Sequence, residues 1–67
     1  MKTIFDIQQY LKQFGTIIYI GDREADLDLM GTELHELYQA QLMEEKEYQI
    51  AMLILKQEMN KIRNKEL

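Results

Sequence analysis

Apolar residues recur along most of the chain at helical spacing, and the first such stripe predicts a helix over residues 4–14. Ile4, Ile7, Leu11 and Phe14 are separated by three or four positions, as on one face of an α-helix. Thr3 directly precedes the segment and is a favourable N-cap. Gly15 follows it and is expected to end the helix, because glycine readily adopts the left-handed conformation found after many helices.

A second helix is predicted over residues 22–40, with Asp22 as its N-cap. The expected buried stripe consists of Leu27, Met30, Leu34, Leu37 and Tyr38. Gly31 lies in the middle of this segment and destabilises a helix by roughly 1 kcal/mol relative to alanine. This glycine indicates either a close packing contact or a weak point.

The third predicted helix spans residues 45–63 and is apolar on two faces. One face comprises Tyr48, Met52, Leu55, Met59 and Ile62, and the other comprises Ile50, Leu53 and Ile54. A helix that is apolar on two sides needs two neighbours. The three segments therefore predict an all-α fold, a three-helix bundle formed as a single domain over residues 1–67.

The segment between the first two helices has a different character. Residues 15–21 read Gly-Thr-Ile-Ile-Tyr-Ile-Gly, a β-branched run with glycine at both ends. A strand needs a partner, and the rest of the chain has helical periodicity. We therefore expect an extended apolar connector whose side chains lie across the bundle, with an edge-paired strand as the alternative.

Composition limits the class of protein. A chain of 67 residues can form only one small core, and the absence of cysteine excludes disulfides and thiolate metal sites. No apolar run approaches the roughly 18 residues of a membrane span. The first residues lead directly into amphipathic sequence rather than into a signal peptide. We expect a cytoplasmic protein with no membrane partner.

The net charge of −4 is unevenly distributed. Residues 22–47 carry nine acids against two cations, whereas residues 48–67 are mildly basic. Duplex DNA binding depends on neutralising several phosphates, which requires a broad basic surface. The charge distribution therefore argues against a duplex DNA partner, but it permits a smaller contact with a single strand.

Two spacings resemble metal sites, and each lacks an essential residue. Asp22, Glu24, Asp26, Asp28 and Glu33 match the ligand positions of a calcium-binding loop. Leu27 stands where that loop needs glycine, and Gln39 stands where the zinc motif that begins at His35 needs a second histidine. We expect no metal, no cofactor and no enzymatic activity, since so small a bundle rarely encloses converging carboxylates.

Four tyrosines have the amphipathic character expected at the rim of a core. Tyr19 differs because it lies on the connector, where its ring could stack on a nucleic-acid base. Gly21 would let the backbone approach closely, and Arg23 would contact a phosphate. Alternatively, Arg23 pairs with Asp26 or another neighbouring acid.

Several short motifs give the chain a resemblance to the YqgQ-like family, small uncharacterised proteins of Gram-positive bacteria. They are Phe5-Asp6-Ile7-Gln8-Gln9, Gly15-Thr16, Ile18-Tyr19, Gly21-Asp22-Arg23, Glu36-Leu37-Tyr38-Gln39-Ala40 and Tyr48-Gln49. The resemblance implies a cytoplasmic three-helix bundle with no established activity, and that family's shape suggests binding of single-stranded nucleic acid. Met43-Glu44-Glu45 departs from the family, in which a threonine-type cap is expected before the third helix.

Two functions are consistent with these features. The favoured one is a non-enzymatic interaction module that binds a protein partner or itself as a dimer or trimer. Its self-association surface would include Met59 and Ile62, which lie beyond the reach of the shorter first helix. The alternative is a weak single-stranded nucleic-acid-binding protein that uses Tyr19, Gly21 and Arg23.

Overall fold

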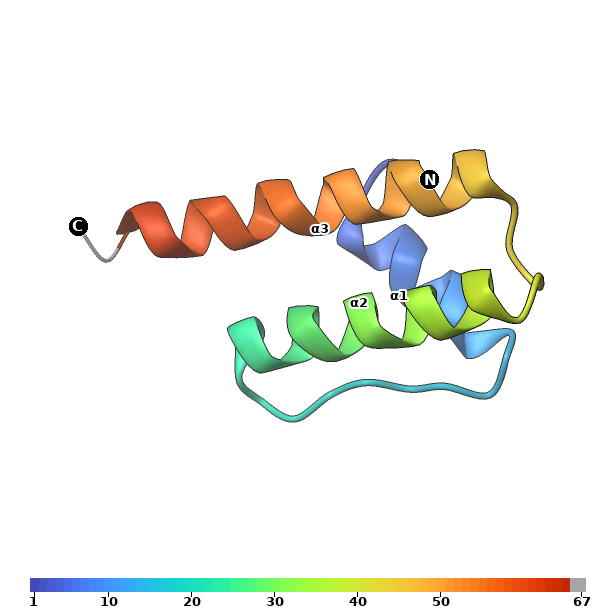
Figure 1. Ribbon diagram of the computed structural model, residues 1–67. Helices are drawn as coiled ribbons and strands as arrows, with labels where there is room; N and C mark the ends of the chain where they lie inside the picture. Colours follow the sequence, from blue (N-terminus) through green and yellow to red (C-terminus); the bar gives the residue numbers. More distant parts are fainter. Residues whose placement is uncertain (66–67) are drawn as a thin grey trace.

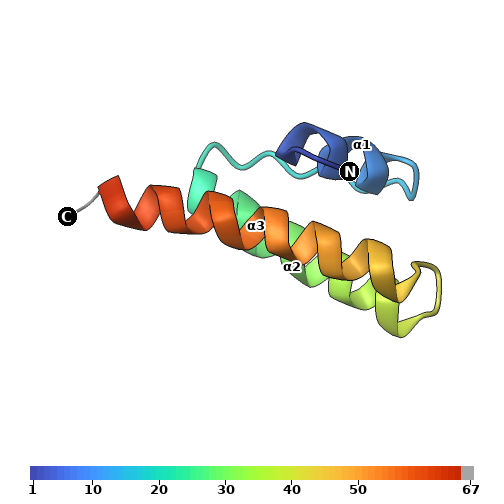
Figure 2. The same cartoon turned by 90° about the horizontal axis from the view of Figure 1, so that it is seen from above.

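The protein is a three-helix bundle. A computed structural model describes residues 1–65 and contains helices α1 (Ile4–Lys12), α2 (Arg23–Gln39) and α3 (Glu45–Lys65), with no strand among the described residues. Helices α2 and α3 run antiparallel and side by side, and α1 lies against one face of this pair (Figures 1 and 2). The predicted all-α class and the extended connector are thus confirmed.

Side-chain caps fix the starts of the first two helices, as the sequence predicts. The hydroxyl of Thr3 accepts the Asp6 N–H at 3.2 Å, and the Asp6 carboxylate accepts the Thr3 N–H at 3.1 Å. Asp6 also accepts the Lys2 N–H at 2.8 Å. Hydrogen bonds from the Lys2 and Thr3 backbone hold the pKa of the Asp6 carboxyl below its ordinary value. Asp22 caps α2 by accepting the Ala25 N–H at 3.1 Å.

Residues in the left-handed conformation follow α1 and α2. Gly15 has a φ of 82°, and the Thr16 N–H donates to the Leu11 carbonyl at 3.1 Å, which is the Schellman pattern. Because α1 ends at Lys12, earlier than predicted, Phe14 leaves the apolar stripe and is exposed. At the end of α2 the same arrangement places Gln41, which is not glycine, at a φ of 61°.

The core forms where the three helices meet. Its buried apolar residues are Ile4, Ile7, Leu11, Leu27, Met30, Leu34, Met43, Ala51 and Leu55. The second apolar face of α3 is only partly used: Ile54 packs against the core, whereas Ile50 and Leu53 are exposed. Ile50 and Leu53 lie on a side of α3 that neither of the other helices covers.

The expectation that the apolar side chains of the connector lie across the bundle is wrong for most of them. Ile18 packs against the core, but Ile17, Tyr19 and Ile20 are 78%, 83% and 60% exposed. Side chains of an extended chain alternate between opposite sides, so Ile17 and Tyr19 face away from the helices when Ile18 faces them. Ile20, next to the bend at Gly21, is exposed as well. An apolar strip consequently remains in contact with water.

Gly31 is a weak point of α2 rather than a required close contact. A Cβ atom built at this position would lie 3.7 Å from Leu55 Cδ1 and 3.8 Å from Met52 Cε. These are ordinary van der Waals distances. An alanine therefore fits the space that the glycine leaves.

None of the helices in residues 1–65 combines the length and the apolar character needed to cross a bilayer.

Candidate interaction surfaces

The connector, defined here as residues 16–20, is held at both ends by hydrogen bonds. At its start, the Thr16 N–H donates to the Leu11 carbonyl at 3.1 Å. At its end, the Ile20 N–H donates to the Asp26 carboxylate at 2.8 Å. Asp26 is only 7% exposed although it is charged. A buried carboxylate at the start of α2 thus fixes the exposed apolar strip in place.

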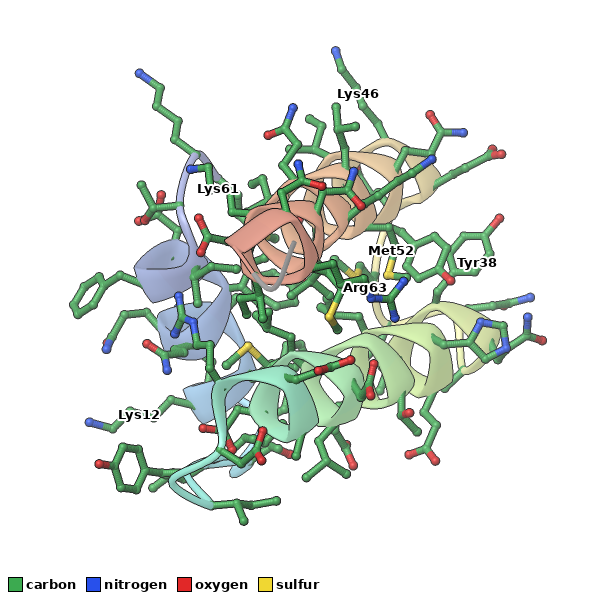
Figure 3. The ribbon with its side chains drawn as sticks, turned by 90° about the vertical axis from the view of Figure 1, so that its left-hand side faces the viewer. Lys12, Tyr38, Lys46, Met52, Lys61 and Arg63 are labelled. Carbon is green, nitrogen blue, oxygen red and sulfur yellow. The ribbon has the colours of Figure 1, made fainter. Side chains whose placement is uncertain are left out.

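Tyr19 lies beside the outer side of α1. A shallow hollow of about 270 Å³ is lined by Ile17, Ile18 and Tyr19 of the connector and by Gln8, Gln9 and Lys12 of α1. Figure 3 shows the Lys12 side chain extending away from the α2–α3 pair. The exposed phenol ring therefore has one cation and two side-chain amides near it.

Arg23 is engaged elsewhere, with an acid that is distant in sequence. Its guanidinium lies 3.4 Å from a carboxylate oxygen of Glu58, and Lys61 lies 3.3 Å from the other oxygen. Hydrogen bonds from Lys61 and then Arg23 lower the pKa of Glu58. The suggested pairing of Arg23 was with Asp26 or another neighbouring acid. The acid is Glu58, 35 positions away, and Asp26 instead accepts the Ile20 N–H.

The structure does not bring the three predicted nucleic-acid-binding residues together in one hollow. Gly21, with a φ of 94°, forms the bend between the connector and α2. Arg23 lines a separate hollow of about 390 Å³ with Lys2 and Lys61, not the hollow beside Tyr19. A ligand that spanned both hollows would have to pass around this bend.

A groove follows the face of the α2–α3 pair that α1 leaves open. It measures about 560 Å³, and its apolar lining includes Leu27, Gly31, Met52 and Met59. Figure 3 shows Met52 and Arg63 between the two helices, on the side opposite α1. At the end of the pair where the α2–α3 loop lies, the rings of Tyr38 and Tyr48 stack 4.5 Å apart. The groove is shallow, and Leu27, which belongs to its lining, is buried in the core.

The residues expected to drive self-association are half-buried. Met59 and Ile62 both pack against the core, although the last turns of α3 extend past the start of α2 (Figure 1). Their role in association stays a prediction. The connector and Leu53 present apolar side chains that are more exposed than these two.

Three titratable side chains have shifted pKa values. Asp6 and Glu58 have lowered pKa values and stay ionised at neutral pH, so neither can act as a general acid there. Burial, followed by the nearby Glu47 carboxylate, raises the pKa of Tyr10. Within residues 1–65, no three histidine or acidic side chains gather closely enough to hold a metal ion.

Sequence reasoning missed the role of Asp26, although a signal for it was present. Asp26 precedes Met30 and Leu34 by four and eight positions, so all three lie on one side of α2. An acid on an apolar face needs a hydrogen-bond donor. The donor could not be named from the sequence, because it is a backbone N–H on the connector.

Comparisons with known proteins agree with the resemblance in sequence. The family model described as YqgQ-like matches residues 1–61. An uncharacterised protein, YqgQ of Bacillus subtilis (strain 168), is 41% identical over 64 residues, which cover 96% of this chain and 90% of that protein. Since the match spans all three helices and the connector, the chain belongs to the YqgQ-like family.

Proposed function

We propose that the protein is a non-enzymatic interaction module whose contact surface is the connector. The observation that carries this proposal is the exposure of Ile17, Tyr19 and Ile20, three large apolar side chains within four positions. Exposed apolar clusters of this kind mark interaction sites in soluble proteins. A partner that covered them would remove apolar surface from water, which is the main favourable contribution to most protein association.

The connector is well prepared to bind. Hydrogen bonds to Leu11 and Asp26 hold its two ends, so little further ordering is needed when a partner arrives. Lower ordering entropy on binding leaves more of the contact energy as affinity. The connector also lies within residues 13–21, nine consecutive positions without a charged side chain. A partner that covers this strip therefore desolvates no charged side chain of the connector itself.

Affinity purification from the native cell tests this function. The bait is either the wild-type chain, the double variant Ile17→Ser/Tyr19→Ser, or the control Leu53→Ser, which removes an exposed apolar side chain from α3. We expect the wild type and the control to retain the same protein partners, and the double variant to lose them. Retention of the same partners by all three baits would contradict the proposal.

Single-stranded nucleic-acid binding is a second candidate function, favoured by one specific observation. The 83% exposed ring of Tyr19 borders the same hollow as Lys12, which places a stacking surface beside a cation. Stacking on an aromatic side chain contributes roughly 1–3 kcal/mol per base. Arg23 would join only by giving up part of its contact with Glu58.

Fluorescence anisotropy with labelled oligonucleotides tests the second candidate. We expect weak binding to single strands that is reduced by Tyr19→Ala and by Lys12→Ala, and reduced less by Arg23→Ala. The slope of log affinity against log salt should be shallow, near −1, because about 0.7 is expected per phosphate contact. Wild-type binding equal to that of the Tyr19→Ala/Lys12→Ala variant would exclude this function. Repeating the affinity purification after nuclease treatment separates the two candidates.

A further inference from the structure

We propose that the connector pairs with the connector of a second copy of this chain, as two antiparallel strands related by a two-fold axis at Ile18. This inference rests on the proposed function, because it names the partner that the exposed strip fits. It concerns the backbone as much as the side chains. An extended segment presents a row of N–H and C=O groups along each of its two edges.

Only one edge of the connector is engaged within the molecule. The N–H groups of Thr16 and Ile20 both point inward, to the Leu11 carbonyl and the Asp26 carboxylate. Backbone groups of alternate residues in an extended chain face opposite edges. Ile17 and Tyr19 therefore direct their N–H and C=O groups outward, and within residues 1–65 these N–H groups have no hydrogen-bond partner.

The outward edge fits a second copy of itself. With the two-fold axis at Ile18, Ile17 lies opposite Tyr19 of the second copy, and the two residues can exchange both backbone hydrogen bonds. The same register places the most exposed side chains of the connector, Ile17 and Tyr19, against each other. A cross-strand pair of a β-branched and an aromatic side chain is one of the favourable combinations in antiparallel sheets.

The two-fold axis gives the antiparallel orientation. It runs perpendicular to the paired strands, and rotation about it reverses the chain direction while it brings identical edges together. Residues 13–21 carry no charge, so no charged side chain of this segment lies opposite another in the proposed register.

The geometry also limits the assembly to two chains. Because the inner edge of the connector is covered by its contacts with α1 and α2, pairing of the two outer edges leaves no free edge for a third copy.

The features that usually protect an exposed strand edge from pairing, a proline or a charged side chain, are absent from residues 13–21. An interface made by so short a pair of strands is far smaller than the roughly 1,600 Å² of a standard interface, so the dimer should be weak and concentration-dependent.

Cysteine cross-linking tests both the dimer and its register, and the described chain contains no cysteine of its own to interfere. We would mix Ile17→Cys with Tyr19→Cys under mild oxidation and compare the yield with each variant alone. In the proposed register these two positions face each other, at about 5.5 Å between Cα atoms. Identical positions lie about 7–8 Å apart on the diagonal, too far for most disulfides. Leu53→Cys serves as the control for random collision, because it is an exposed position on α3.

We expect the mixed pair to give at least several-fold more cross-linked dimer than either variant alone or than Leu53→Cys. Circular dichroism would verify that each variant retains the helical fold. Equal yields from all pairs, or the highest yield from Leu53→Cys, would overturn the strand pairing. Partner capture that depends on the connector would in that case still support the proposed function with a different partner. If the mixed pair gave no higher yield and partner capture did not depend on the connector, the inference and the proposed function would both be rejected.

Discussion

At the scale of single residues, Asp26 has a structural role that is unusual for an acidic side chain. Its buried carboxylate joins α2 to the connector through the Ile20 N–H. Asp26→Ala removes the acceptor, and we expect the free energy of unfolding to fall by about 1–3 kcal/mol. Asp26→Asn keeps an acceptor oxygen, so its free energy of unfolding should fall by less. Urea denaturation of the two variants checks this, and equal losses would contradict it.

Asp6 gives the protein a small acid sensitivity. Its folded-state pKa lies below the ordinary value of 3.8, so its capping interaction stabilises the fold above that pH. The contribution is lost as the pH falls from there through the folded-state pKa. We expect the difference in unfolding free energy between the wild type and Asp6→Asn to be present at pH 7 and to shrink below about pH 4. A difference that stays constant down to pH 2 would show that the charge of Asp6 does not matter.

At the scale of the elements, α2 contains a correctable weakness at Gly31. The space beside it accepts a methyl group at 3.7–3.8 Å, so Gly31→Ala should raise the free energy of unfolding by roughly 1 kcal/mol. Gly15→Ala is the matched control, because the same change at a φ of 82° forces a side chain into the left-handed region. In thermal denaturation, we expect Gly31→Ala to raise the stability of the protein and Gly15→Ala to lower it. A loss of stability in both would mean that the α2–α3 contact cannot accept the methyl group.

The end of α2 offers a second test of backbone conformation. Gln41 holds a φ of 61° at the position that glycine usually occupies, which costs about 1–2 kcal/mol for a residue with a Cβ atom. Part of this cost is offset by the greater freedom of glycine in the unfolded chain. We therefore expect Gln41→Gly to stabilise the protein by up to about 1 kcal/mol in urea titrations. Gln39→Gly, at the last residue of α2, should instead destabilise the protein, by less than the roughly 1 kcal/mol that glycine costs in a helix interior.

The helices could be predicted from the sequence because their signals are local. Apolar stripes, the caps at Thr3 and Asp22, and the left-handed Gly15 each depend on a few neighbouring residues. The pairing of Arg23 with Glu58 joins residues 35 positions apart, which no local pattern reveals.

The exposure of the connector was harder to predict, since Ile17 and Ile18 are chemically identical and face opposite environments. Only the placement of α1 and α2 decides which of the two reaches the core. The same holds for Leu53, which belongs to an apolar face of α3 but lies on a side that neither of the other helices covers.

At the scale of the whole molecule, the helices and the connector have separate tasks. Helices α2 and α3 form an antiparallel pair, α1 closes one face of it, and the connector runs outside the core (Figures 1 and 2). The core can therefore remain intact while the connector contacts another chain. Substitutions at Ile17 and Tyr19 should accordingly change association without lowering the helix content.

The most direct test of the connector as the contact surface is a concentration series of ¹H–¹⁵N NMR spectra, from about 20 µM, where a small interface should be dissociated, to about 1 mM. We expect the chemical-shift changes to concentrate on residues 14–21, with the largest changes at the amides of Ile17 and Tyr19. We also expect these changes to disappear in Tyr19→Ser. Spectra that stay unchanged over the series would contradict the pairing of the connector with a second copy. Changes confined to Leu53 or to Met59 and Ile62 would contradict the assignment of the contact surface to the connector.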